Sequence, residues 1–384
     1  MTEERSCRDG CTAGEQAGPS RSTCLATPPP DSADNARRAG FATRKAAEEG
    51  LTDLLGEIRT DVVAGTGTIK LEGWLTEWLA AVKPSLRPST YSLYSTAVTS
   101  WITPRLGALK LAEVTPQVVQ RLYTDVATSG GRSGQGLSPR SVRLAHQVLQ
   151  QAFAKAVQWK LTANNPLASG IILPRMEPKE MKTLSSEDAK AFLDATADDR
   201  LGPLWCLLLT TGLRRGEALG LRWSDVDLAD ARLEVRQTVV AVKGTPLISE
   251  PKTKTGRRTV YLSGRTTEAL KDQRARQKAD RKLVGSAWED SGLVFTTTTG
   301  GLLHPRNVLR DFQIALDKAN LPKVRLHDLR HTVATLLLHE GAHPKVVQEL
   351  LGHANVAITL NTYSHATPGL HREAAEMLEG VLKL

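Results

Sequence analysis

A segment rich in proline and charge, Pro174–Met181, divides the chain into two stretches that each have a helical pattern. It holds two prolines, and proline lacks a backbone N–H and disfavours helical geometry in the residue before it. A single helix therefore cannot run across this segment. We expect a linker over residues 174–182 between two folded regions, 68–173 and 183–384, which fits a chain of 384 residues if a domain has roughly 100–200.

The first region, 68–173, is predicted to be all-helical. Apolar residues recur at i, i+3, i+4 and i+7 within Leu71–Leu79, which gives a helix one buried face. Another helix is expected to begin at Pro88. Thr115 and Ser138 are each followed by proline, and a capping hydroxyl before a proline at the first helical position is typical of helix starts.

The second region, 183–384, is predicted to be mainly helical with a small antiparallel β-sheet. β-Branched and aliphatic residues indicate one strand over Leu233–Val240, a second near Leu247–Ser249 and a third over Thr259–Leu262. Turn signals between them, such as Lys254-Thr255-Gly256, favour hairpins. The expected fold class is therefore mainly α, with a helical first domain and a second domain that carries the sheet.

Residues 1–67 give a weaker pattern. Residues 1–40 are rich in Ser, Thr, Gly, Ala and Pro and hold few large apolar side chains, so we expect them to be disordered. Residues 41–67 read as one helix followed by a Gly/Thr linker. Cys7, Cys11 and Cys24 could be three zinc ligands, but no second close Cys or His pair follows them, which favours incidental thiols and no metal site.

The charge of the chain suits a polyanionic partner. The formal net charge is +9 and the sequence pI is about 9.4, and Lys and Arg neutralise phosphates and release their counterions. A merely basic soluble protein would have the same charge, so charge alone does not decide. No stretch approaches the roughly 20 apolar residues of a membrane helix, and the N-terminus has no apolar signal segment. We therefore expect a cytoplasmic protein with no membrane partner.

Two arginines of the second region have neighbours that suit them for binding an anion. Arg214 follows the helix-ending Gly212, so it lies at the start of a new helix, where the dipole favours an anion. Glu217, three residues later, can hold its guanidinium. Arg330 lies three residues after His327 at another helix start, so the two share one face. Alone, the first pattern is typical of a surface ion pair and the second of a histidine bound to a nearby carbonyl.

A basic hairpin tip and a C-terminal tyrosine complete the set. Lys252–Arg258 concentrates lysines and arginines at a turn, from which Lys254 can reach into a groove and donate a proton. Gly352 ends a short helix in the C-cap position, His353 follows it, and Tyr363 comes ten residues later. Alone, the tip reads as a solvated loop and the tyrosine as a half-buried aromatic.

Together these residues suit phosphoryl transfer. Two arginines, two histidines and a lysine can converge on one phosphate, and a tyrosine can supply the nucleophile. The chain has no Gly-rich Lys-Ser/Thr loop for ATP and no dense Asp/Glu cluster for two metal ions. We therefore expect side-chain cations, without a metal or another cofactor, to stabilise the transition state.

In order and spacing, these segments resemble the tyrosine recombinases, and most of all the integrases of actinobacterial phages and integrative plasmids. The resemblance extends over residues 41–384 and rests on Thr211–Leu221, Lys254-Thr255-Gly256, His327–Arg330, Leu351–His353 and Tyr363. It implies that 68–173 is a SAM-like core-binding domain, which clamps DNA, and that 183–384 is the catalytic domain.

The resemblance also implies a catalytic role for each residue. Tyr363 would attack a DNA phosphate and leave a 3′-phosphotyrosyl link, while Arg214 and Arg330 would hold the non-bridging oxygens. Lys254 would protonate the leaving 5′-oxygen. A second lysine two residues earlier is an alternative, but the Thr-Gly that follows Lys254 favours Lys254. His327 would assist proton transfer at the tyrosine.

Supporting roles follow from the same resemblance. His353 would hydrogen-bond the phosphate, and Glu217 would be structural support. Arg257 and Arg258 would contact the DNA backbone. The stretch His371–Leu384 would form a helix that docks either on a neighbouring subunit or on its own domain.

As a family member, the chain would act as a homotetramer on two double-stranded DNA attachment sites, and a DNA-bending host factor and an excisionase are candidate partners. Integrases of this layout usually carry a small N-terminal β-sheet domain for arm-type DNA sites. Here residues 1–40 replace its strands, and 41–67 would be a remnant helix and linker. The alternatives are a resolvase of the same chemistry, a type IB topoisomerase and a non-catalytic DNA-binding remnant.

Overall fold

The computed structural model describes residues 68–352, except for 132–133, 169, 178–180, 243 and 251–255, and the single residues 48, 355, 379 and 382. The predictions for residues 1–40, for the helix within 41–67 and for the helix within His371–Leu384 rest on residues outside this description. Within the described residues, no helix combines the length and the apolar character that crossing a membrane requires.

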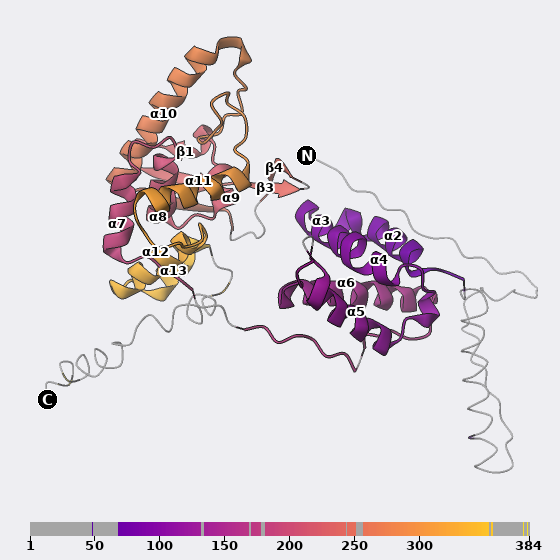
Figure 1. The fold of residues 1–384 in the computed structure, drawn as a ribbon. Helices are drawn as coiled ribbons and strands as arrows, with labels where there is room; N and C mark the ends of the chain where they lie inside the picture. The colour runs from indigo at the N-terminus through magenta and orange to yellow at the C-terminus, as the bar shows by residue number, and fades with distance from the viewer. Residues whose placement is uncertain are drawn as a thin grey trace, which may run out of the picture. The chain divides into compact units, whose positions relative to one another are not determined.

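The N-terminal part is a set of helices (Figure 1) that surround one apolar core. Its elements are α2 (Leu71–Val82), η1 (Lys83–Ser85), α3 (Pro88–Thr96), the π-helical η2 (Ala97–Ile102), α4 (Thr103–Leu106), η3 (Leu111–Glu113), α5 (Pro116–Ser129) and α6 (Pro139–Gln158). Trp74 and Trp78 of α2 are buried, as the apolar stripe predicts. The hydroxyls of Thr115 and Ser138 each accept a hydrogen bond from the N–H three residues later, which confirms the predicted starts of α5 and α6.

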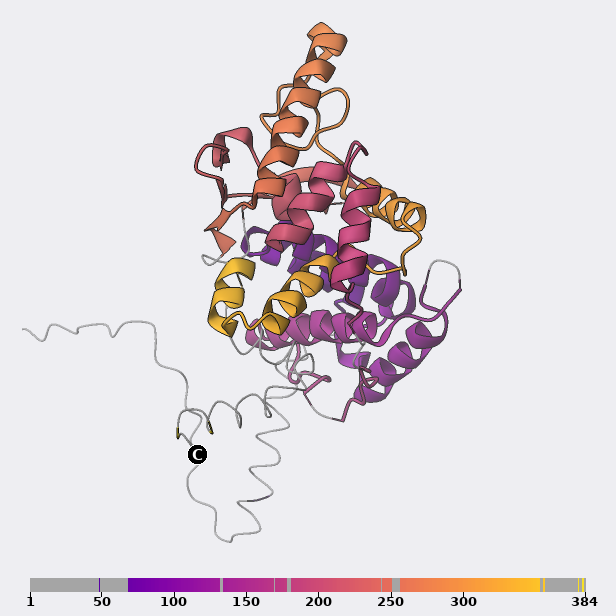
Figure 2. The ribbon, with the colours of Figure 1, turned by 90° about the vertical axis from the view of Figure 1, so that its left-hand side faces the viewer.

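The C-terminal part is mainly helical and has an apolar core of its own. Its helices are α7 (Ser186–Ala195), α8 (Gly202–Thr211), α9 (Arg215–Leu219), η4 (Trp223–Asp225), α10 (Gly264–Val284), η6 (Gly285–Ala287), α11 (Pro305–Lys318), α12 (Asp328–His339) and α13 (Pro344–Leu351). Almost every residue of α8 is buried, and α10 and α12 both pack against it. In both ribbon views α10 extends away from the end that carries α12 and α13 (Figure 1, Figure 2).

The strands form two small antiparallel sheets. One has the order β1-β2-β5, from β1 (Val226–Asp227), β2 (Arg232–Val235) and β5 (Arg258–Tyr261). The other is a hairpin of β3 (Thr238–Val242) and β4 (Thr245–Ser249), in which Val240 pairs with Leu247. The predicted fold class, mainly α with a small antiparallel sheet, is confirmed.

The prediction of one continuous strand over Leu233–Val240 is wrong, because the chain changes sheets after Val235. The side chain of Gln237 donates a hydrogen bond of 2.8 Å to the carbonyl of Gly220 and anchors the break. The following strand passes so close to α9 that a Cβ on Gly216 would lie 2.4 Å from the Thr238 hydroxyl. Contacts with distant glycines therefore override the local strand pattern.

Two helix ends that carry predicted site residues meet within this part. α8 ends at Gly212 and α13 ends at Gly352, both in the left-handed conformation, with φ of 63° and 65°. Glycine adopts this conformation without steric cost, and the two predicted helix stops are confirmed. A Cβ on Gly212 would lie only 2.5 Å from a methyl group of Leu351, so the missing side chain also permits the close approach of the two ends.

Candidate active site

Arg214 lies immediately before α9, as its N-cap residue. Its Nη1 donates a hydrogen bond to Glu217 Oε1 at 2.7 Å, and its backbone N–H donates to Oε2 at 3.0 Å. Its Nη2 donates to the carbonyl of Gly352 at 3.2 Å. Because 41% of the side chain is exposed, the guanidinium is fixed by the protein on one side and accessible on the other.

Arg330 lies in the first turn of α12 and is buried, with 2% of its surface exposed. Its Nη1 donates to the carbonyl of Gly212 at 2.7 Å, and its Nη2 donates to the carbonyl of Leu351. One side chain therefore joins the start of α12 to the ends of α8 and α13. Two carbonyl acceptors also fix the plane of the guanidinium, so the whole group is held in one orientation.

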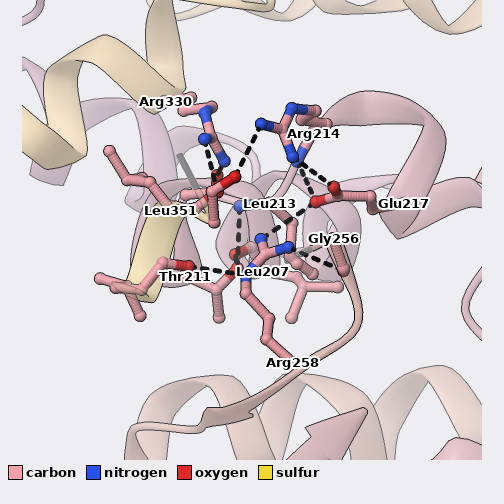
Figure 3. A network of polar contacts seen from close by, with 12 residues as sticks. Leu207, Thr211, Leu213, Arg214, Glu217, Gly256, Arg258, Arg330 and Leu351 are labelled. Atoms are coloured by element: carbon pink, nitrogen blue, oxygen red, sulfur yellow. Dashed lines mark hydrogen bonds and ion pairs between the residues drawn. The ribbon is translucent and has the colours of Figure 1, made fainter. Parts of the chain in front are cut away.

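The C-terminal end of α13 holds three guanidiniums (Figure 3). The carbonyls of residues 350–352 accept hydrogen bonds from Arg258 Nε at 2.8 Å, from Arg330 and from Arg214, in that order along the chain. Carbonyls at a helix C-terminus lack helical partners and carry the negative end of the helix dipole. This helix end therefore gathers three positive charges that would otherwise repel one another.

Arg258 makes its hydrogen bonds within the protein. Its side chain is 8% exposed, and its Nη2 donates to Glu217 Oε2 at 3.0 Å. These contacts indicate an internal role, and the contact of Arg258 with the DNA backbone stays a prediction. Arg257, in contrast, is 63% exposed and forms a long ion pair of 3.7 Å with Glu250, and its DNA contact stays a prediction.

Glu217 is buried and yet ionised. Burial alone would raise the pKa of its carboxyl group, but the guanidiniums of Arg258 and Arg214 and the backbone N–H of Arg214 outweigh this effect and lower the pKa. The carboxylate is therefore charged at neutral pH and compensates two arginines at once. This geometry supports the structural role predicted for Glu217.

His327 precedes α12 as its N-cap residue, and its ring lies edge-on to that of His331, with ring centres 5.1 Å apart. The residue keeps an exposed surface, but the protein packed around the ring, followed by the charges of His331, Arg330 and Arg214, lowers the pKa of His327 to about 4. The imidazole is therefore neutral at pH 7 and can accept a proton. His331 is not among the residues predicted for the site, although its spacing of four residues from His327 places both on one helix face.

Because the pKa of His327 is low in the folded state, acidification should lower the stability of the protein. The pKa of His327 in the folded state lies below its usual 6.5, so the unfolded state takes up the proton first and stability falls as the pH drops from 6.5 towards about 4. The pKa of His331 is lowered as well. In urea unfolding at about pH 7.5 and about pH 5, the wild type should lose more free energy of unfolding than His327→Gln. An equal loss of free energy of unfolding in the two proteins would contradict a lowered pKa of His327.

Of the predicted catalytic residues, the described part of the chain contains Arg214, His327 and Arg330. It brings them together where the start of α9, the start of α12 and the end of α13 meet. Lys254, His353 and Tyr363 lie outside the described residues, so their positions stay predictions.

The arrangement suits the chemistry of phosphate esters. An accessible guanidinium held by a buried carboxylate lies close to a second, buried guanidinium and to a neutral imidazole. Preorganised cations of this kind stabilise the charge that develops on a phosphoryl group. A neutral imidazole nearby can take the proton of an attacking hydroxyl.

Comparisons with known proteins find matches over most of the chain. The family model described as "Phage integrase family" matches residues 174–369, and the model described as "Phage integrase, N-terminal SAM-like domain" matches residues 70–126. A protein named tyrosine recombinase XerC-like, from Caldanaerobacter subterraneus subsp. tengcongensis, is 31% identical over 355 residues, which cover 88% of this chain and 89% of that protein.

Solved structures share the fold. The Tn1549 transposon integrase in complex with a circular intermediate DNA aligns with a TM-score of 0.67 at 22% identity, over 81% of this chain and 100% of that chain. A lambda integrase tetramer bound to a Holliday junction aligns with a TM-score of 0.55 at 18% identity, over 83% of this chain and 89% of that chain. At these identities the likeness is one of fold.

Proposed function

The chain belongs to the phage integrase family of tyrosine recombinases, and from this premise we propose that it cuts and rejoins DNA at specific sites through a covalent bond between Tyr363 and a DNA phosphate. It is an enzyme of DNA recombination, similar to the integrases of phages and transposons. One observation carries the proposal for this chain. Arg214 and Arg330 converge on the end of α13, and both charges act on the ring of His327.

The two arginines would hold the non-bridging oxygens of the scissile phosphate. Arg330 would do so from the protein interior, where two carbonyls fix its plane, and Arg214 from the accessible side. Glu217 and the carbonyls at the end of α13 hold both guanidiniums in position before DNA binds. Stabilisation of the pentavalent transition state then requires little reorganisation of the protein.

Tyr363 would attack phosphorus, so that a bond forms between its oxygen and phosphorus while the bond from phosphorus to the 5′-oxygen breaks. His327 would take the proton of the tyrosine hydroxyl, and Lys254 would give a proton to the leaving 5′-oxygen. His353 would donate a hydrogen bond to the phosphate. One phosphate ester replaces another, so the free 5′-hydroxyl can reverse the step and rejoining needs no ATP.

We assign residues 68–173 to a core-binding domain and 183–384 to the catalytic domain, with double-stranded attachment-site DNA as their shared partner. The net charge of +9 supports this partner, because cations that neutralise phosphates provide sequence-independent affinity. The assembly would be a homotetramer on two DNA sites that integrates or excises mobile DNA. A DNA-bending host factor and an excisionase would be accessory partners.

Removal of the Tyr363 hydroxyl should abolish covalent attachment to DNA. Wild type and Tyr363→Phe would be mixed with labelled DNA from the regions that flank the gene, in the presence of EDTA, and resolved on denaturing gels. We expect a protease-sensitive adduct with the wild type and none with the variant, because phenylalanine keeps the ring but has no nucleophile. The DNA affinity of the variant should stay within a few-fold of the wild type, since the hydroxyl is one contact among many.

Other outcomes would identify the alternatives. DNA binding by the wild type without an adduct, under any pairing of sites, would contradict the proposal and indicate a non-catalytic remnant. An adduct accompanied only by relaxation of supercoiled DNA would indicate a topoisomerase. Deletion between two sites on one molecule, without joining of two molecules, would indicate a resolvase.

A further inference from the structure

We propose that Arg258 is a positioning residue for DNA cleavage, because it ties Glu217 to the end of α13 and so holds both phosphate-binding arginines in place. The inference rests on the proposed function, since its main readout is the rate of cleavage. It replaces the DNA-backbone contact that the sequence predicts for this residue.

Arg258 joins two parts of the site that are far apart in the sequence. It is the first residue of β5, and its guanidinium bonds to Glu217, 41 residues away, and to the carbonyl of Leu350, 92 residues away. A third hydrogen bond, of 3.4 Å, runs from Nη1 to the carbonyl of Gly256. A planar guanidinium with several donors can span these acceptors at once, which the single ammonium group of a lysine cannot do.

The first route from Arg258 to the site runs through Glu217 (Figure 3). Glu217 Oε1 accepts from the guanidinium of Arg214, and Oε2 accepts from that of Arg258, so the carboxylate is held between two arginines. Without Arg258 this buried carboxylate would lose one of its two compensating charges. Its pKa would rise towards the value that burial favours, and its orientation beneath Arg214 would no longer be fixed.

The second route runs through the end of α13. Arg258 holds the carbonyl of Leu350, and the next two carbonyls along the chain hold Arg330 and Arg214. A loss of the first bond loosens the turn that presents the other two. Arg258 therefore supports Arg214 through Glu217 and through the end of α13, and it supports Arg330 through the end of α13.

The strand geometry explains why Arg258 is internal and Arg257 is not. Successive side chains of a strand point to opposite faces. Arg258 lies on the same face of β5 as Val260, which is 1% exposed, whereas Thr259 and Tyr261 are exposed. Arg257, directly before the strand, is 63% exposed.

The test compares Arg258→Ala and Arg258→Lys with a control, Arg276→Ala. Arg276 also donates a hydrogen bond of 2.8 Å to a carbonyl, that of Asp199, which is not one of the residues that hold the site arginines. Single-turnover cleavage, DNA affinity at several salt concentrations and urea unfolding would be measured for each protein. We expect Arg258→Ala to cleave about 100-fold more slowly at nearly unchanged DNA affinity, because a displacement of about 1 Å costs a factor of this size.

The other variants should separate position from stability. Arg258→Lys should recover only part of the rate, since it can pair with Glu217 but cannot also reach Leu350. Arg276→Ala should cleave at the wild-type rate whatever stability it loses. If Arg258→Ala does not fold, the comparison of Arg258→Lys with the wild type carries the test.

A double-mutant cycle with Glu217→Gln provides a readout of the bridge that is independent of cleavage. The effects of Arg258→Lys and Glu217→Gln on unfolding should be strongly non-additive, as expected for groups in one hydrogen-bonded network. Additive effects, or full cleavage by Arg258→Ala, would overturn the inference. Weaker DNA binding with a salt dependence reduced by about one phosphate contact would also overturn it and restore the DNA contact. A wild type that never cleaves would instead contradict the proposed function.

Discussion

Arg214→Ala should lower the single-turnover rate of DNA cleavage by about 10²–10³-fold, the usual cost of removing one preorganised donor to a developing charge. The stability of the protein should fall less than on loss of a fully buried arginine, because 41% of the Arg214 side chain is exposed, even though the buried Glu217 loses one of its two guanidinium partners. Glu217 would keep its second partner, Arg258. DNA affinity should also be largely retained, since many other cations neutralise phosphates.

The measurement combines cleavage of labelled DNA with enzyme in excess, a binding titration and urea unfolding. Arg214→Lys is the matched variant, because it keeps the charge but loses the planar geometry that contacts Glu217 and the Gly352 carbonyl together. We expect it to recover less than the full rate. If Arg214→Ala cleaves at the wild-type rate, Arg214 does not belong to the active site.

Arg330→Ala should lose cleavage to a similar or greater extent and should also destabilise the protein. The side chain is 2% exposed, and its removal leaves the carbonyls of Gly212 and Leu351 without this donor in a buried setting. At about 1–3 kcal/mol for each of the two buried carbonyls that lose their partner, the free energy of unfolding should fall by about 2–6 kcal/mol. Urea unfolding would give this value, and cleavage would be measured at a temperature well below the unfolding transition of the variant.

The contrast between the two arginines is itself informative. Both alanine substitutions should reduce cleavage, but only Arg330→Ala should reduce stability strongly. Of the two arginines, only Arg330 is buried among carbonyls that have lost contact with water. If Arg330→Ala were as stable as the wild type, the hydrogen bonds to α8 and α13 would not hold the site together. If it cleaved DNA normally, the assignment of the phosphate-binding pair would be wrong.

Features that depend on a few neighbouring residues could be predicted from the sequence. The starts of α5 and α6 follow from a capping hydroxyl before a proline, and the ends of α8 and α13 from Gly212 and Gly352. The pairing of Arg214 with Glu217 is equally local, at a spacing of three residues. Each of these predictions needs only the geometry of one helix end.

Features that depend on distant contacts could not be predicted. The break between β2 and β3 is anchored by Gln237 on Gly220, and the internal role of Arg258 depends on Glu217 and Leu350. A run of lysines and arginines at a turn does not reveal which cation points inward, because the pairing of β5 with β2 decides which of its side chains face the core. The low pKa of His327 likewise arises only once the folded protein packs around its ring and brings His331, Arg330 and Arg214 close to it.

The most direct test of the central claim is to identify the residue to which DNA becomes attached. The trapped adduct of the wild-type protein would be digested with nuclease and protease, and the peptide that carries the nucleotide remnant would be sequenced by mass spectrometry. We expect the remnant on the peptide that contains Tyr363. Attachment to another residue, such as Tyr261, which is 75% exposed, would contradict it. So would DNA that is cut without any linked peptide.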